Sequence, residues 1–127
     1  MPHPFAKLID LRYLEQGPGH SVCRIVVADK HLNPNQVVHG AVMFALADVG
    51  MGAAVFPTLA EGELCATVEI KINYFKPVRD GELVCTTTLL NRGKTLANLD
   101  SDVHCGGQLV AKANGTYAIF TPAKVQR

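Results

Sequence analysis

The sequence predicts an α+β fold in which a curved antiparallel sheet of five to six strands packs against one long helix. Three observations predict this class. Residues 41–56 are apolar on every side apart from one charge, Asp48, which is typical of a buried helix. Two strand-like segments precede this stretch and four follow it. The connections between the segments are short, as antiparallel neighbours allow, so the helix must lie across one face of the sheet.

The segments before the helix predict a β-hairpin followed by a loop. Residues 8–15 alternate loosely and end at a Gly-Pro-Gly turn, residues 17–19. Residues 20–28 then show the two-residue period of a strand. A polar loop, residues 29–38 with Asn33 near its centre, leads into the helix.

The apolar stretch predicts the single long helix, and Pro57 ends it. The stretch is too short for a membrane span, which needs about 20 apolar residues, so we expect it to be buried against the sheet. Gly50 and Gly52 each cost about 1 kcal/mol of helix propensity relative to alanine. We expect both glycines to let neighbouring elements approach the helix closely.

Four extended segments follow the helix. Residues 64–75 form a long β-branched run in which polar and apolar residues alternate, and a turn at residues 77–81 ends it. Residues 82–90, 95–104 and 108–120 are the other three. Turns at residues 91–94 and 105–107 separate them, which favours antiparallel pairing.

Length and composition indicate one domain, residues 1–127, that buries roughly two thirds of the surface of its unfolded chain. Hydrophobic residues make up 48% and charged residues 18%, as in a soluble globular protein. The net charge of +1 provides no broad basic field, so we expect neither nucleic acid nor membrane as a partner. Residues 1–5 lack the pattern of a secretory signal, so we expect a cytoplasmic location.

The cysteines and histidines predict no metal site. No C-x-x-C pair is present, and each cysteine lies in a strand-like run, which favours four buried thiols: Cys23, Cys65, Cys85 and Cys105. His31 and His39 lie eight residues apart without a nearby cysteine. The sequence likewise has no Gly-rich phosphate loop.

Asp48 is the one charged residue of the predicted helix. An isolated carboxylate in an apolar interior costs several kcal/mol unless it is paired, hydrogen-bonded or protonated. Asp48 therefore either caps a neighbouring segment, faces a wet crevice, or is a catalytic carboxylate that burial makes a useful base.

Gly40, at the first turn of the helix, is a candidate oxyanion donor. The first N–H groups of a helix lack intrahelical partners, and the absence of a Cβ lets an atom approach the backbone closely. Gly40 can equally be a simple helix start. Asp48 lies eight residues further on, roughly 12 Å along the axis, whereas reacting groups must lie within about 3 to 3.5 Å. Two helices packed antiparallel across a two-fold axis would supply both groups to two composite sites.

These residues carry a resemblance to a known family. The run Asn33-x5-His39-Gly40-x7-Asp48, followed by TVEIKINYFKP at residues 67–77 and RGKT at residues 92–95, resembles the hotdog-fold acyl-CoA thioesterases. Within that 4-hydroxybenzoyl-CoA thioesterase superfamily it is most similar to the phenylacetyl-CoA-degradation branch and its mammalian relatives. The resemblance covers residues 5–120.

The resemblance implies a hotdog fold, with a sheet wrapped around the helix, in dimers and usually homotetramers whose active sites lie at the subunit interface. The implied substrate is an acyl-CoA, with coenzyme A as part of the substrate and no separate cofactor. The implied reaction is hydrolysis of the thioester of an aromatic or aliphatic acyl group.

By position, the resemblance implies that Asp48 is the catalytic carboxylate, as general base or nucleophile, and that Gly40 gives the oxyanion N–H. Asn33 would help to hold the thioester or water, and Thr67 matches a Ser/Thr of the partner subunit that orients the water. For His39, beside the positive helix end, we expect a packing or hydrogen-bonding role. The residues that would hold coenzyme A, unless they are ordinary solvated turn residues, are Lys76, Arg79, Arg92, Lys94 and Thr95.

Two positions depart from the family pattern. Ala41 stands where the family usually has a second glycine, which narrows the space beside the helix start and bears on substrate shape. Gln36 stands where a glycine is common, three residues before the histidine. Of the nearby asparagines, we expect Asn33 rather than Asn35 to face the substrate.

Two other functions fit the fold less well. A hotdog hydratase pairs an aspartate with a histidine five residues later, but Ala53 follows Asp48 at that spacing and Pro34 follows Asp29. A non-catalytic acyl-CoA-binding protein would keep the fold and pocket. Such relatives carry an added DNA-binding module, for which we expect no room in 127 residues.

Overall fold

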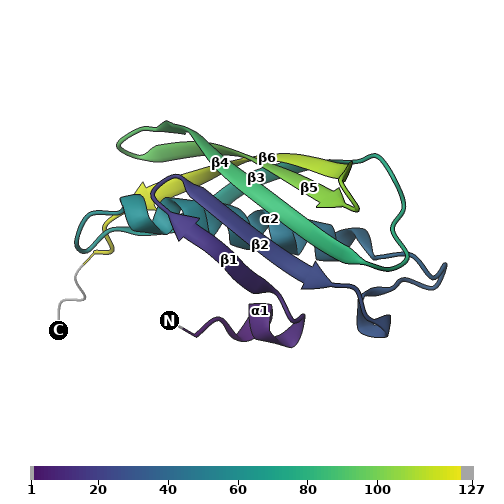
Figure 1. Ribbon diagram of the computed structural model, residues 1–127. Coiled ribbons are helices and arrows are strands. Elements are labelled where there is room, and N and C mark those ends of the chain that lie inside the picture. Colours follow the sequence, from purple (N-terminus) through teal and green to yellow (C-terminus); the bar gives the residue numbers. More distant parts are fainter. Residues whose placement is uncertain (1, 124–127) are drawn as a thin grey trace.

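The computed structural model describes residues 2–123. Its elements, in chain order, are α1 (Pro4–Leu8), β1 (Arg12–Gly17), β2 (His20–Val26), the 3-10 turn η1 (Asp29–His31), α2 (Gly40–Val55), the 3-10 turn η2 (Phe56–Thr58), β3 (Leu64–Tyr74), β4 (Glu82–Arg92), β5 (Leu96–Cys105) and β6 (Gln108–Phe120). The six strands form one antiparallel sheet in the order β1-β2-β4-β5-β6-β3. Figure 1 shows α2 lying across one face of this curved sheet. The predicted class, one long helix on an antiparallel sheet, is confirmed.

The first helix, α1, was not predicted. Residues 8–15 were expected to be extended, but the strand begins only at Arg12. His3 caps α1, because its Nδ1 atom accepts the Ala6 N–H at 3.1 Å, and Pro4 occupies the first turn. Asp10, with φ of 57°, then turns the chain into β1. A five-residue helix is set by its capping residues rather than by apolar periodicity, which is why the periodicity missed it.

The central helix, α2, is buried by the sheet, as predicted. Leu46, Met51 and Val55 are fully shielded from solvent. The argument from length was wrong, however: α2 and η2 together make a 19-residue helical segment that is long and apolar enough to cross a membrane by length and composition alone. More than half of that segment is buried inside the protein, so α2 is the core helix of this fold.

Of the two helix glycines, only Gly50 makes a close approach. A Cβ on Gly50 would lie 2.7 Å from the Thr87 hydroxyl, and the Ser21 hydroxyl donates to the Gly50 carbonyl at 2.6 Å. A Cβ on Gly52 would meet no atom within 4 Å among the described residues. The prediction of close packing is therefore confirmed for Gly50 and wrong for Gly52.

All four cysteines lie in strands and are free thiols, but only two are buried. Cys23 and Cys85 are directly opposite each other in β2 and β4, on the face that α2 covers. Cys65 and Cys105 are half-buried. The expectation of four buried thiols is thus wrong for these two, because Cys65 lies in an edge strand and Cys105 is the last residue of β5.

Strand β3 forms one edge of the sheet and pairs only with β6 among the described strands. Most of its 11 residues are exposed. A β-bulge interrupts its register between Thr67 and Glu69. Long strands with an unpaired edge are templates for pairing with another chain.

Candidate active site

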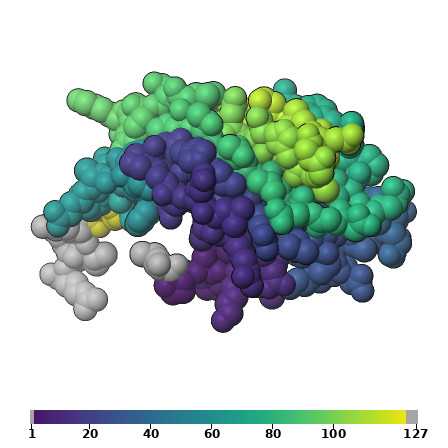
Figure 2. Space-filling model, in the orientation of Figure 1, coloured from purple at the N-terminus to yellow at the C-terminus, as the bar shows by residue number. Residues whose placement is uncertain are grey.

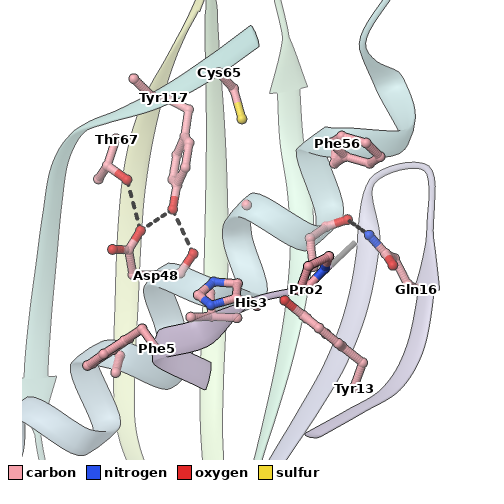
Figure 3. Close-up of a pocket in the computed structure, with 15 residues that line it drawn as sticks. Pro2, His3, Phe5, Tyr13, Gln16, Asp48, Phe56, Cys65, Thr67 and Tyr117 are labelled. Atoms are coloured by element: carbon pink, nitrogen blue, oxygen red, sulfur yellow. Dashed lines mark hydrogen bonds between the residues drawn. The ribbon is translucent and has the colours of Figure 1, made fainter. Parts of the chain in front are cut away.

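Asp48 lies on α2 and its carboxylate is held by two hydroxyl groups (Figure 3). The Thr67 hydroxyl donates to Oδ1 at 2.9 Å, and the Tyr117 hydroxyl donates to the same oxygen. The Tyr117 hydroxyl also lies 2.7 Å from the main-chain carbonyl oxygen of Asp48. Within residues 2–123, no hydrogen bond reaches Oδ2. Asp48 is half-buried and hydrogen-bonded rather than isolated in the core.

The pairing register of the edge strand β3 with its neighbour β6 brings these hydroxyls together. Thr67 on β3 is directly opposite Tyr117 on β6, so both side chains lie on the face that α2 covers. The bulge after Thr67 bends β3 at this point, as bulges near functional sites often do. Thr67 thus contacts Asp48 of its own chain, and that contact needs no partner subunit.

Two titratable groups beside Asp48, the Tyr117 hydroxyl and the Cys65 thiol, keep their protons in this environment. Burial first, and the hydrogen bond to Asp48 second, raise the pKa of Tyr117 far above its usual range, so its hydroxyl stays a donor. Burial first, and the charge of Asp48 second, raise the pKa of the Cys65 thiol. A thiol that holds its proton is a poor nucleophile, so Cys65 does not compete with Asp48 for that role.

An open cavity of about 560 Å³ lies beside Asp48. Its walls come from the N-terminal segment, β1, α2, β3 and β6, and Figure 3 shows the labelled lining residues around it. Most of the α2 lining is small and apolar, with Ala45, Val49 and Ala53. Mostly apolar walls with a few polar groups are typical of a small-molecule site.

Sequence reasoning missed several residues of this cavity. Tyr117, the most important of them, has one local signal: the alternation of β6 places it on the inner face of the sheet. Nothing local shows that it reaches a residue 69 positions away. The lining also includes His3, which caps α1, Phe5 within α1, and Tyr13 and Gln16 from β1, all from segments that were assigned no role in the site.

The start of α2 has its own set of contacts, separate from those around Asp48. His39 caps the helix, because its Nδ1 atom accepts the Ala41 N–H at 3.0 Å. The Gly40 N–H has no acceptor within residues 2–123. The Tyr74 hydroxyl donates to the Gly40 carbonyl at 2.8 Å, and a Cβ on Gly40 would lie 3.0 Å from the Tyr74 ring. Glycine at this position therefore admits Tyr74 of the same chain.

Asn33 organises the loop before α2. Its side-chain oxygen accepts the Asn35 N–H at 2.9 Å and the Val37 N–H at 3.4 Å. Gln36 within this loop has φ of 64°, in the left-handed region that favours glycine. The family preference for glycine at this position thus has a backbone cause. The side-chain oxygen of Asn33 is used by the loop, and within residues 2–123 its NH₂ group makes no hydrogen bond.

Asp48 and the start of α2 are not brought together within one chain. The lining of the cavity beside Asp48 contains neither Asn33, His39 nor Gly40. The axial separation of Gly40 and Asp48 remains roughly 12 Å, since both lie in one α-helix. One copy of the chain therefore carries two halves of the predicted site at two different places.

The predicted coenzyme A residues fall into two groups at opposite ends of the molecule (Figure 1). Lys76 and Arg79 flank Val78, whose carbonyl accepts the Val38 N–H just before α2. Lys94 and Thr95 are exposed in the β4–β5 hairpin, the green projection in Figure 2. One chain does not bring the two groups together.

Arg92 is engaged within its own chain. Its guanidinium donates to the Thr58 hydroxyl at 3.0 Å and to the Gly93 carbonyl, and pairs with Glu63 at 3.3 Å. These contacts fasten the end of β4 to the segment after α2. Within residues 2–123, Arg92 therefore has a structural role. Lys94, by contrast, is an exposed cation in the same hairpin.

Known proteins share this fold and its sequence pattern. Residues 35–112 match the sequence model of the family described as the thioesterase superfamily. The chain belongs to the thioesterase superfamily. Human acyl-coenzyme A thioesterase 13 is 31% identical to this thioesterase over 102 residues, which cover 78% of this chain and 72% of the human protein. The predicted thioester hydrolase is thereby confirmed at the level of the family.

Solved structures confirm the hotdog fold of this thioesterase. The conserved protein PA5202 of Pseudomonas aeruginosa superposes with a TM-score of 0.86 at 33% identity, over 94% of this chain and 96% of that chain. A mutant of the phenylacetic acid degradation protein PaaI of Thermus thermophilus gives a TM-score of 0.86 at 25% identity, over 91% of this chain and 98% of that chain. The predicted resemblance to this family is confirmed.

Proposed function

We propose that this thioesterase hydrolyses an aromatic or aliphatic acyl-CoA to the free acid and coenzyme A, with Asp48 as the catalytic carboxylate. The observation that carries the proposal is a carboxylate held on one oxygen by two hydroxyls beside a mostly apolar cavity. Such a cavity suits an acyl group, and an oriented carboxylate beside it suits the activation of water. The name of the human relative states the same substrate class.

The proposed reaction uses water, Asp48 and the Gly40 N–H. Asp48 removes a proton from water as the water oxygen attacks the thioester carbon, and the carbonyl oxygen accepts the Gly40 N–H as it gains negative charge. The C–S bond then breaks and coenzyme A leaves as a thiolate, which needs little acid assistance. Direct attack by Asp48, through an anhydride that water opens, is the alternative form of this mechanism. Neither form requires a separate cofactor.

A second copy of the chain would complete the site. On β3, Thr67 contacts Asp48 and Tyr74, seven residues later, contacts Gly40. If the exposed edge of β3 pairs antiparallel with β3 of a second copy, the Tyr74 end of one strand lies beside the Thr67 end of the other. That pairing carries Gly40 of one chain toward Asp48 of its partner. We therefore propose a homodimer with two composite sites, and a homotetramer of two such dimers.

The coenzyme A moiety would lie outside the cavity. Lys76 and Arg79, and separately Lys94 and Thr95, remain our candidates for its phosphates, because cations at exposed turns pair with phosphate oxygens and a hydroxyl can donate a hydrogen bond to them. In a dimer these groups come from different chains, which removes the conflict that they lie at opposite ends of one chain. Asn33 and His39 belong to the same proposed half-site as Gly40.

Substitution of Asp48 by asparagine tests the catalytic role. We expect Asp48→Asn to reduce turnover at least ~100-fold, because an amide cannot take the proton from water. The measurement is a spectrophotometric free-thiol assay over a panel of aromatic and aliphatic acyl-CoA esters. Circular dichroism and size-exclusion chromatography provide the control for fold and assembly. Near-native turnover by the folded variant would refute the role.

Mixing two inactive variants tests the composite site. Asp48→Asn lacks the base, and Gly40→Pro lacks the N–H while keeping Asp48. Co-refolded in equal amounts, the two chains would restore about a quarter of wild-type activity, since half of the dimers are mixed and each mixed dimer has one intact site. Gly40→Ala retains the N–H and controls for the contact with Tyr74. No recovery on mixing would show that each chain works alone.

A further inference from the structure

We infer that Tyr117 is a positioning residue: together with Thr67 it holds Oδ1 of Asp48, so that Oδ2 is the oxygen that acts on the substrate or water. This inference rests on the proposed role of Asp48. It extends that role to a residue that no sequence pattern singles out, and it names the reacting atom.

Within residues 2–123, the hydrogen bonds to the Asp48 carboxylate reach only one of its two oxygens. Both hydroxyls meet at Oδ1, and Figure 3 shows the other carboxylate oxygen directed away from them. Tyr117 also reaches the main-chain carbonyl of Asp48, so one hydroxyl contacts both the backbone and the side chain of the same residue. That bridge fixes the side chain relative to α2. An oxygen that already accepts two hydrogen bonds has little capacity left for a proton, so the proton of water goes to Oδ2.

Tyr117 is suited to act as a permanent donor. Tyr117 is 3% exposed and belongs to a buried apolar cluster that includes Met51, Leu99 and Ile119. Its hydroxyl keeps its proton because burial disfavours the phenolate and raises the pKa of Tyr117. Tyr117 would therefore hold the Asp48 carboxylate in one orientation without exchanging a proton itself.

Thr67 takes a related role. The family resemblance assigns this position to a residue of the partner subunit that orients water. The geometry instead places the Thr67 hydroxyl on the carboxylate of its own chain, opposite Tyr117 across the β3–β6 pair. Thr67 and Tyr117 thus work as one unit, and loss of one leaves the other to hold Oδ1.

Tyr117→Phe tests the inference, since it removes the hydroxyl and keeps the buried ring. We expect kcat to fall about 10-fold with KM within about two-fold, because the lost contact orients a reacting group rather than binding substrate. A KM that stays in place while kcat falls is the signature of lost positioning, because a merely structural change would alter both parameters.

Thr67→Val and a double variant sharpen the test. Thr67→Val should likewise lower kcat while KM stays within about two-fold. The combination of Tyr117→Phe with Thr67→Val should lower kcat by more than the product of the two single effects, because the two hydroxyls share one acceptor. Thr87→Val is the matched control: it removes a buried hydroxyl that pairs with Ser101 at 2.7 Å, outside the cavity, and should leave kcat and KM in place.

The outcomes separate this inference from the proposed function. An active Asp48→Asn variant would overturn the proposed function itself. If Asp48→Asn is inactive while Tyr117→Phe keeps the wild-type kcat, the proposed function stands and the positioning role is overturned. A Tyr117→Phe variant in which kcat falls, KM rises by a similar factor and the melting temperature is lowered would also overturn it, because a purely structural role predicts that result.

Discussion

Asp48 shows how far the behaviour of a single residue depends on its neighbours in space. The helix around it is apolar, and both of its hydroxyl donors come from strands that follow in the sequence. A carboxylate without such partners would cost several kcal/mol in an apolar setting. The two hydroxyls offset that cost and leave one carboxylate oxygen without a hydrogen bond within residues 2–123. The contacts that make Asp48 tolerable in the fold are therefore also those that would orient it for its proposed role as a base.

Gln36 is the residue at which a local change should improve stability. Its φ of 64° is strained for a residue with a Cβ. We expect Gln36→Gly to stabilise the protein by about 0.5–1 kcal/mol, because relief of about 1–2 kcal/mol of left-handed strain exceeds the entropic cost of glycine. Urea unfolding at neutral pH measures this change.

Asn35→Gly is the control for Gln36→Gly. Asn35 is adjacent in the same loop, and Gln36 and Asp10 are the two residues other than glycine with positive φ among residues 2–123. Glycine at position 35 adds entropy to the unfolded chain without relieving strain, so this variant should be less stable than the wild type. Equal destabilisation by both substitutions would contradict the assignment of strain to Gln36.

Helix α2 organises the molecule as an element. One part of its surface packs on the sheet, with Leu46, Met51 and Val55 fully buried. Another part, with Ala45, Val49 and Ala53, lines the cavity. Its start and its middle carry the two proposed half-sites, with Gly40 at the start and Asp48 in the middle. A helix that is apolar all round thus supplies both part of the core and one wall of the cavity.

The two glycines of α2 form a matched pair for testing how the helix packs. Gly50→Ala would place a Cβ 2.7 Å from the Thr87 hydroxyl, so we expect a loss of about 1–3 kcal/mol in the free energy of unfolding. Gly52→Ala meets open space, so we expect a gain of up to about 1 kcal/mol from helix propensity. Denaturant unfolding compares the two variants. Similar stability of both would contradict the close approach of α2 and β4 at Gly50.

At the scale of the whole molecule, the core encloses a pair of buried thiols. Cys23 and Cys85 lie opposite each other under α2, and neither is exposed to solvent. Burial first, and the neighbouring Cys85 second, raise the pKa of Cys23 to about 12, and burial raises the pKa of Cys85 to about 11. The folded protein therefore holds two thiol protons that the unfolded chain releases at lower pH.

Stability should consequently fall in alkaline solution. Both thiols contribute fully below pH 9.0, their usual pKa, and the contribution is lost as the pH rises toward 11 and 12, because only the unfolded chain loses its protons in this window. We expect Cys23→Ala to flatten the decline of unfolding free energy with pH above 9, measured by urea titrations under reducing conditions. An unchanged slope in this variant would contradict the prediction.

The sequence alone was enough to infer the elements and their order along the chain. Apolar periodicity predicted α2 and all six strands, with bounds within a few residues except at β1. Glycines and prolines marked the turns between them. These features succeed because helix and strand periods, and the conformations of turn residues, are local properties of the backbone. Helix α1 was missed because its cap, His3, is a single side-chain contact without a period.

The pairing of residues distant in the chain came only from the folded structure. Strand β3 lies beside β6 rather than beside β4, its neighbour in sequence, and the bulge after Thr67 sets the register of that pair. This register places Tyr117 on Asp48, and places Tyr74 of the same edge strand on Gly40. Strand order and register depend on how the whole sheet closes around α2, since each contact joins segments that share no local pattern.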